Sequence, residues 1–212
     1  MRQRSFLTRS GLVKSSVMAV NKKDIPAIRF WTPLRIVSTL IVLVLLGALG
    51  ISSCNSNNSS SRTANLPVVP AVVFDTEMRA ANGVPIKLSN YSGKVLFVNL
   101  WATWCGPCRM ETPELVRLHK EYQARGVEFV GLSTEDPNTS AQKVRDFVTQ
   151  YGVAYHIGWA TREVALTLMD GKPTIPQSFI ITRDGRLFRK IDGFHPRRTP
   201  PELRKALEEA LL

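Results

Sequence analysis

The sequence is poor in the side chains that build metal sites. It contains three cysteines and three histidines in 212 residues. A structural zinc site takes four such ligands, usually arranged as close pairs. The only close pair is Cys105 and Cys108, whereas Cys54 and the histidines (His119, His156 and His195) are scattered along the chain. We therefore predict neither a metal site nor a bound cofactor.

Acidic residues are also scarce. The chain has 17 Asp or Glu against 28 Lys or Arg, which gives a formal net charge of +11. A basic balance can indicate a nucleic-acid partner. However, residues 1–35 alone hold eight Lys or Arg against one acid and account for +7, leaving +4 for the rest. A small excess interleaved with acids is typical of a solvated surface, so we predict no nucleic-acid partner.

A charge-free segment follows the basic one. Residues 36–51 contain no charged side chain, and the unbroken apolar part covers residues 40–51. Basic residues followed by apolar ones predict an export signal or membrane anchor over 1–53, with a basic part at 1–35 and an apolar part at 36–53. Because the positive flank stays in the cytoplasm, we expect the rest of the chain on the periplasmic side of a bacterial membrane, where disulfides persist.

The apolar segment ends at Ile51-Ser52-Ser53-Cys54, which resembles the lipobox of bacterial lipoproteins. In this interpretation Cys54 receives the lipid, and residues 54–66 form a flexible polar tether. Two alternatives stay open. One is an uncleaved helix over about 31–53, with Cys54 incidental, and the other is a true start at Met18.

Residues 67–212 have the pattern of one α/β domain. An apolar content of 44% and a charged content of 21% support a single core of ordinary size. Strands are predicted where apolar residues run together, and helices where they recur at helical spacing. Because a strand, a helix and a strand in succession imply parallel pairing, we predict a mixed β-sheet flanked by helices.

The first expected element of this domain is a hairpin of 72–74 and 84–88 around Asn82-Gly83. It is followed by a strand at 94–100, a helix at 108–122, a strand at 127–132, a helix with an apolar face over 144–151, a strand at 154–159 and a short helix at 161–169. The domain ends with a hairpin of 177–182 and 186–191 and with a last helix that opens at Thr199, where Thr199 and Glu202 form a capping box.

The motif Trp104-Cys105-Gly106-Pro107-Cys108 lies where a buried strand gives way to a helix. The first thiol faces unpaired backbone N–H groups and the positive end of the helix dipole, so its pKa should fall. Cys105 is therefore the expected nucleophile, and Cys108, one turn into the helix, would resolve the mixed disulfide. A merely structural disulfide is the weaker alternative, because closing so short a loop removes little unfolded-state entropy.

The segment from Phe97 to Pro113, FVNLWATWCGPCRMETP, resembles the thioredoxin superfamily. Within it the segment is similar to the TlpA/ResA group of membrane-tethered thiol-disulfide oxidoreductases, whose thioredoxin domain is of the AhpC/TSA redoxin type. The resemblance covers about residues 67–212. It implies a thioredoxin-like fold, a redox-active disulfide of Cys105 and Cys108, substrate proteins with disulfides or thiols, and a membrane reductase as electron donor. It also suggests reduction, for instance of apocytochrome c before haem attachment.

Further site residues follow from the same resemblance. Pro176 matches the family's cis-proline, which faces the cysteines and exposes the backbone of Ile175 to a substrate chain. Glu111 matches an acidic residue near the cysteines that would accept the proton of Cys108; the alternative is a solvated helix glutamate. Asn99 stands where cytoplasmic thioredoxins carry a buried aspartate. The substrate surface is expected to include Trp104, Gly106 and Pro107.

Two other functions fit parts of the pattern. A peroxiredoxin-like thiol peroxidase shares the core, but its reactive cysteine follows a threonine and has no close cysteine partner. A membrane-tethered copper-delivery protein would bind Cu(I) through soft thiolates, but that family places three residues between its cysteines. We expect His119 on a helix surface, His156 in a strand and His195 in a loop, with no Cys–His hydrolase pairing.

Overall fold

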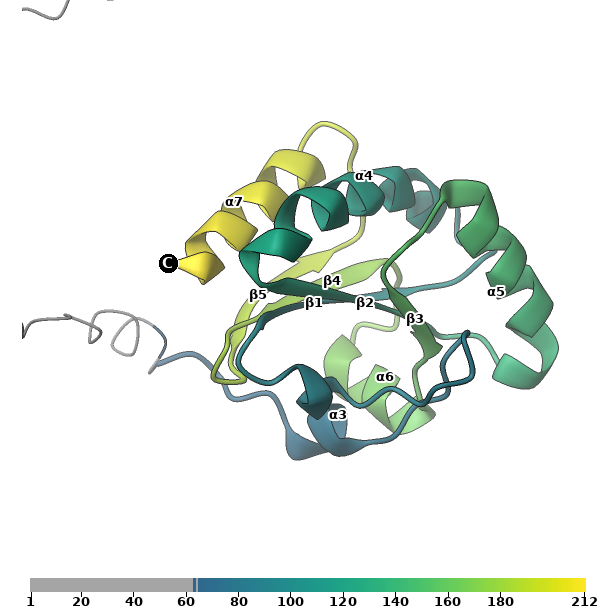
Figure 1. Ribbon diagram of the computed structural model, residues 1–212, viewed down its shortest axis with the longest axis horizontal. Helices are drawn as coiled ribbons and strands as arrows, with labels where there is room; N and C mark the ends of the chain where they lie inside the picture. The colour runs from purple at the N-terminus through teal and green to yellow at the C-terminus, as the bar shows by residue number, and fades with distance from the viewer. Residues whose placement is uncertain (1–62, 64) are drawn as a thin grey trace, which may run out of the picture. The chain divides into compact units, whose positions relative to one another are not determined.

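The computed structural model describes residue 63 and residues 65–212. Cys54, the predicted signal or anchor and most of the predicted tether lie outside these residues. The described part contains one five-stranded sheet with helices on both faces, shown in Figure 1. The predicted mixed sheet flanked by helices is therefore confirmed.

The sheet has the strand order β3-β2-β1-β4-β5. Its strands are β1 (Val95–Trp101), β2 (Val127–Ser133), β3 (His156–Trp159), β4 (Gln177–Ile181) and β5 (Leu187–Asp192). The first three pair in parallel, and β4 and β5 are antiparallel to their neighbours. Every residue of the central strand β1 is buried, as a strand covered on both faces requires.

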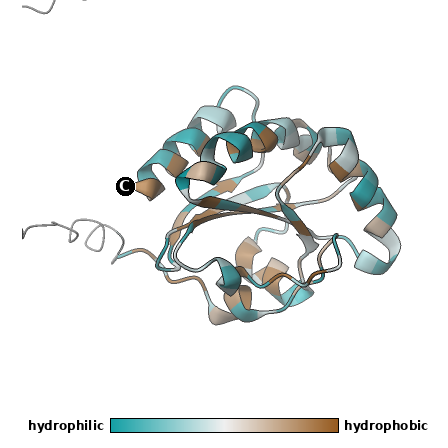
Figure 2. Ribbon diagram, in the orientation of Figure 1, coloured by the Kyte–Doolittle hydropathy of each residue, from teal (hydrophilic) through white to brown (hydrophobic). Residues whose placement is uncertain are grey.

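The helices are α3 (Ala71–Asp75), α4 (Gly106–Tyr122), α5 (Pro137–Tyr151), α6 (Arg162–Met169) and α7 (Thr199–Leu211), with 3-10 turns η1 (Leu88–Tyr91) and η2 (Gln123–Arg125). In Figure 1, α4 and α7 lie on one face of the sheet, and α3 and α6 lie on the other. The strands and the inward helix faces are hydrophobic, whereas the outward faces are largely hydrophilic, as Figure 2 shows.

The alternation of side chains along β1 divides the core in two. Leu96, Val98 and Leu100 pack with residues of α3 and α6, while Val95 and Phe97 pack with residues of α4 and α7. A third cluster joins α5 to the carboxyl end of β1 and contains both cysteines. The apolar pattern thus places the cysteines at the carboxyl end of a strand that is buried throughout.

Two predictions near the start of the domain are wrong. Residues 72–74 form part of α3 instead of a strand, because the turn starts at Pro70 and buries Val73 against the sheet. The turn at Asn82-Gly83 is present, but only an isolated bridge between Met78 and Ile86 replaces the expected hairpin. Pro85 lacks the N–H group that a longer ladder would need.

The expected capping box of α7 is also absent. The helix begins at Thr199 without a side-chain cap. The Thr199 hydroxyl instead accepts a hydrogen bond from the backbone N–H of His195 at 2.9 Å, so the preceding loop uses the group that was expected to cap the helix. Nearby loop contacts thus override the local sequence signal.

Gly158 in β3 provides a test of this packing. A Cβ atom at this position would lie 2.7 Å from the backbone oxygen of Arg79 and 3.1 Å from Ile86 Cδ1. We expect Gly158→Ala to lower the free energy of unfolding by about 1–3 kcal/mol, because the backbone of Arg79 would have to move. Urea titration measures this change.

Gly106→Ala is the matched control, since no atom lies within 4 Å of a Cβ atom there. Its unfolding free energy should stay within about 0.5 kcal/mol of the starting protein. Equal stability of both variants would contradict the packing assigned to Gly158.

Candidate active site

The two cysteines lie at the start of α4. Cys105 is the N-cap residue, and its sulfur accepts a hydrogen bond from the backbone N–H of Cys108 at 3.2 Å. The two sulfur atoms are bonded at 2.01 Å. Both side chains are buried, whereas Gly106 and Pro107 between them are exposed. The sulfur of Cys105 therefore faces the positive end of the helix dipole.

The backbone before β4 lies next to Cys105. The carbonyl oxygen of Ile175 is 3.8 Å from Cys105 Sγ, and the Ile175–Pro176 peptide bond is cis. Pro176 is buried, and its carbonyl oxygen accepts a hydrogen bond from Gly193 N at 2.8 Å. The structure thus brings the pair of Cys105 and Cys108 next to the Ile175–Pro176 segment, which lies 67 or more residues further along the sequence.

The two tryptophans of the motif lie in different environments. Trp104 is 71% exposed beside the cysteines, and Met110 is 53% exposed on the next turn of α4. Trp101 is buried and stacks on Phe147, with ring centroids 4.5 Å apart. Only Trp104 is therefore available to a partner at the surface, and Trp101 belongs to the core.

Glu111 is buried behind the cysteines, on the same helix face as Cys108 and one turn further along α4. Its two carboxylate oxygens accept hydrogen bonds from Asn99 Nδ2 at 3.0 Å and from Ser178 Oγ at 3.1 Å. Asn99 Nδ2 also donates to Ser178 Oγ at 3.0 Å, which closes a triangle of polar groups across α4, β1 and β4. The alternative of a solvated helix glutamate is therefore wrong.

Burial controls the acid-base properties of this region. It raises the pKa of Glu111 to about 7, and the hydrogen bonds from Asn99 and Ser178 limit the rise. Burial likewise raises the pKa of Tyr155, with a further contribution from the charge of Glu111. A carboxyl with a pKa near neutrality can both take up and release a proton under ordinary conditions.

The structure contradicts the predicted position of one histidine. His119 is buried on α4, where its ring contacts Phe129 and Tyr155 edge-on, and burial lowers its pKa. The prediction placed it on a helix surface, because helical spacing alone did not show that Tyr155 covers this side of α4. His156 begins β3 and His195 lies in a loop, as predicted.

The sequence did not indicate two groups that contact this site. Ser178, two residues after Pro176, contacts Glu111 directly. Glu135 accepts hydrogen bonds from the backbone N–H and the hydroxyl of Thr103, at 2.7 and 2.8 Å. Glu135 lies just beyond the carboxyl end of β2, and polar residues at such strand ends often line the sites of α/β proteins, a signal that could have identified it.

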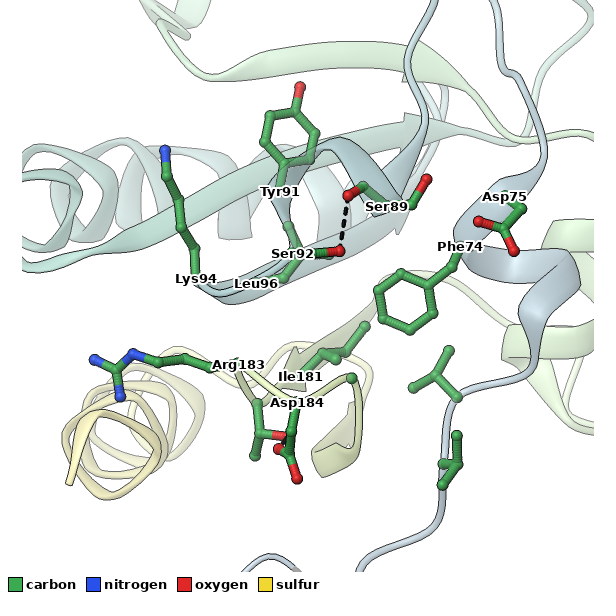
Figure 3. A pocket seen from close by; sticks show the side chains of 14 residues that line it. Phe74, Asp75, Ser89, Tyr91, Ser92, Lys94, Leu96, Ile181, Arg183 and Asp184 are labelled. Carbon is green, nitrogen blue, oxygen red and sulfur yellow. Dashed lines mark hydrogen bonds between the residues drawn. The ribbon is translucent and has the colours of Figure 1, made fainter. Parts of the chain in front are cut away.

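A hollow of about 380 Å³ lies at the end of β1 that is opposite to the cysteines. Figure 3 shows the ring of Phe74 beside Leu96 and above Ile181, with the cations of Lys94 and Arg183 on one side of the hollow. This hollow takes no part in the cysteine site. Within residues 63 and 65–212, no group of three His, Cys, Asp or Glu could hold a metal ion, and no helix has the length and apolar character of a membrane span.

The chain is similar to known proteins that are named as thiol-disulfide oxidoreductases. The AhpC/TSA family matches residues 69–189. The chain is 32% identical over 159 residues to the thiol-disulfide oxidoreductase ResA of Bacillus subtilis (strain 168), covering 74% of this chain and 84% of the relative. It is 30% identical over 158 residues to ResA of Geobacillus kaustophilus (strain HTA426), covering 74% and 87%.

Solved structures share the fold. A putative thiol:disulfide interchange protein DsbE from Chlorobium tepidum is 25% identical, with a TM-score of 0.60 over 69% of this chain and 97% of that chain. Peroxiredoxin Q from Xanthomonas campestris is 17% identical, with a TM-score of 0.57 over 70% and 98%. At that identity the second likeness concerns the fold alone.

The raised pKa of Glu111 predicts a pH-dependent stability. A carboxyl that titrates near 7 in the folded chain and near 4.5 in the unfolded chain stabilises the fold fully below pH 4.5. This stabilisation, about 3 kcal/mol, is lost as the pH rises through 7, because ionising the buried group is costly. Glu111→Gln removes the dependence.

Urea titrations from pH 4 to 8 on both proteins measure this effect. The unfolding free energy of the starting protein should fall relative to that of Glu111→Gln as the pH rises. A difference between the two proteins that does not change with pH would contradict the assigned pKa.

Proposed function

The chain belongs to the AhpC/TSA family and is a ResA-like thiol-disulfide oxidoreductase of the thioredoxin superfamily, and from this premise we propose that it reduces disulfides of exported proteins outside the cytoplasm. One observation carries the proposal. The cysteine pair at the start of α4 lies beside the backbone of Ile175, whose carbonyl oxygen is 3.8 Å from Cys105 Sγ, so a substrate chain paired with that backbone would bring its disulfide to Cys105.

The reaction begins with both cysteines reduced. The Cys105 thiolate attacks one sulfur of the substrate disulfide, forming a mixed disulfide and releasing the other substrate sulfur as a thiolate, which takes up a proton. Cys108 then loses its proton and attacks Cys105 Sγ, which releases the second substrate thiolate. The products are a substrate dithiol and the Cys105–Cys108 disulfide, so two electrons pass from the protein to the substrate.

Glu111 is the proposed acceptor of the Cys108 proton. It lies on the same face of α4 one turn after Cys108, and its pKa of about 7 suits proton transfer near neutral pH. Because the acid is buried, the second step takes place away from solvent. Asn99 and Ser178 hold the carboxylate through the hydrogen bonds described above.

The direction and location of the reaction are supported by the sequence. Gly106-Pro107 is the spacer found in reducing thioredoxins, and the basic and apolar segments over 1–53 are typical of export. We propose attachment to the membrane through a lipid on Cys54 or an uncleaved helix, with a membrane reductase restoring the dithiol. Apocytochrome c is a substrate of the kind that the resemblance suggests. The domain division at 54–66 and 67–212 is part of this proposal.

Thiol peroxidase activity is the second candidate, favoured by the AhpC/TSA match and by the fold of peroxiredoxin Q. Its chemistry would need Cys105 to react with a peroxide rather than with a disulfide. The nearby resolving cysteine and the backbone of Ile175 beside Cys105 favour a disulfide substrate.

Trapping the mixed disulfide tests the proposed function. With Cys54→Ser as background, Cys108→Ser should accumulate a covalent adduct with a disulfide-bonded protein, because the second attack cannot occur. Cys105→Ser, the matched control, should form at least about tenfold less adduct, because Cys108 lies within the first turn of α4 and lacks the N-cap position that stabilises a thiolate at Cys105. Non-reducing gel electrophoresis with mass spectrometry measures both adducts.

Peroxide turnover separates the two candidates. The reduced protein should reduce a protein disulfide rapidly and consume hydrogen peroxide slowly when no thiol substrate is present. Fast peroxide consumption together with absent adduct formation would contradict the proposal and favour the peroxidase.

A further inference from the structure

The loop that carries the nucleophile is held by a carboxylate from a different strand. Thr103 lies two residues before Cys105, and both its backbone N–H and its hydroxyl donate to Glu135, at 2.7 and 2.8 Å. Ser133 Oγ donates to the same carboxylate at 3.1 Å and accepts from the backbone N–H of Glu135 at 3.2 Å. These contacts join the β1–α4 loop to the β2–α5 loop.

The bonding of Glu135 is unusual for an acid. Among the residues that the structure describes, no lysine, arginine or histidine forms an ion pair with it, and the residue is partly buried. A partly buried carboxylate that lacks a cation depends on hydrogen-bond donors to offset its desolvation. Here Thr103 supplies two of the three donors. The negative charge of Glu135 is therefore stabilised mainly by hydrogen bonds from the active-site loop.

The middle of the turn that carries the nucleophile has few other contacts. Trp104 is 71% exposed, so little packing fixes its position. Cys105 N donates to Ala102 O at 3.2 Å, which closes a tight turn over residues 102–105. The buried side chains of Ala102 and Cys105 anchor the two ends of this turn, and the Glu135 carboxylate holds Thr103 between them.

We propose that Glu135 is a positioning residue that orients the 102–105 turn, and with it Trp104 and Cys105, for a protein substrate lying along Ile175. The inference rests on the proposed function and deepens it. A protein disulfide must meet the surface of Trp104, the sulfur of Cys105 and the backbone of Ile175 together. A small disulfide needs only the sulfur. Loss of the Glu135 contacts should therefore affect the two kinds of substrate unequally.

The test is the single-turnover oxidation of the reduced full-length protein, with Cys54→Ser as background, by insulin and by oxidised glutathione. Glu135→Ala should lower the second-order rate with insulin at least about tenfold, because small misplacements of reacting groups cost that much. The rate with oxidised glutathione should stay within about twofold, because that reaction does not use the oriented surface.

Four variants accompany Glu135→Ala. Thr103→Ala removes one of the two Thr103 donors and should show the same selective loss to a smaller degree, whereas Thr103→Ser keeps the hydroxyl and should restore the insulin rate. Glu135→Gln keeps one acceptor and should be intermediate. Glu163→Ala is the charge control, since Glu163 is an exposed acid at the start of α6 without an ion pair among the described residues.

The outcomes are distinct. Selective loss with insulin in Glu135→Ala and Thr103→Ala, but not in Glu163→Ala, supports the proposal. Equal losses with both substrates, or none, overturn it. If Glu135→Ala does not fold, Thr103→Ala and Glu135→Gln decide by the same criterion. If the starting protein reacts with insulin no faster than Cys105→Ser, the proposed function fails and the positioning role fails with it.

Discussion

The hydrogen bond from the backbone N–H of Cys108 to Cys105 Sγ, 3.2 Å long, is the contact on which the site depends. It forms because β1 ends in the buried core and the chain turns over residues 102–105 directly into α4. The free N–H group of Cys108, in the first turn of the helix, therefore points at sulfur instead of water. A thiolate at Cys105 is stabilised by this group and by the helix dipole, whichever substrate the protein meets.

Polar groups gather around this contact, although the surrounding core is apolar. Asn99, Glu111 and Ser178 bind one another behind the cysteines, and Glu135 holds Thr103 in front of them. Burying acids in this way lowers stability unless hydrogen bonds offset the desolvation. The protein accepts this cost at the carboxyl end of β1, where a proton acceptor and a fixed loop serve the chemistry.

The local pattern of the sequence was sufficient to predict the strands of the sheet and the position of the cysteine motif. The apolar runs predicted the five strands of the sheet, and the position of the cysteine motif between a buried strand and a helix predicted its place near the start of α4. Local pattern failed where another segment decides the outcome. The apolar residues around Val73 pack as a helical turn, and His119 is covered by Tyr155.

Contacts between site residues that are far apart in the sequence could not be predicted from local pattern either. Ser178 meets Glu111 across 67 residues, and Thr103 meets Glu135 across 32. A serine in a strand has many ordinary roles, so Ser178 carried no signal of its own. The position of Glu135 just beyond the carboxyl end of β2 could have marked it as a candidate, but not its contact with Thr103. The resemblance to the TlpA/ResA group indicated Glu111 and Pro176, but not the residues that hold Glu111 and the active-site loop.

The reduction potential of the Cys105–Cys108 couple tests the central claim most directly. It is measured by equilibrating the full-length protein, with Cys54→Ser to leave one cysteine pair, against a series of thiol and disulfide buffers. A reductase should have a potential near that of thioredoxin, about −270 mV. A value near −120 mV would contradict the account, because such a couple would oxidise the proteins it meets.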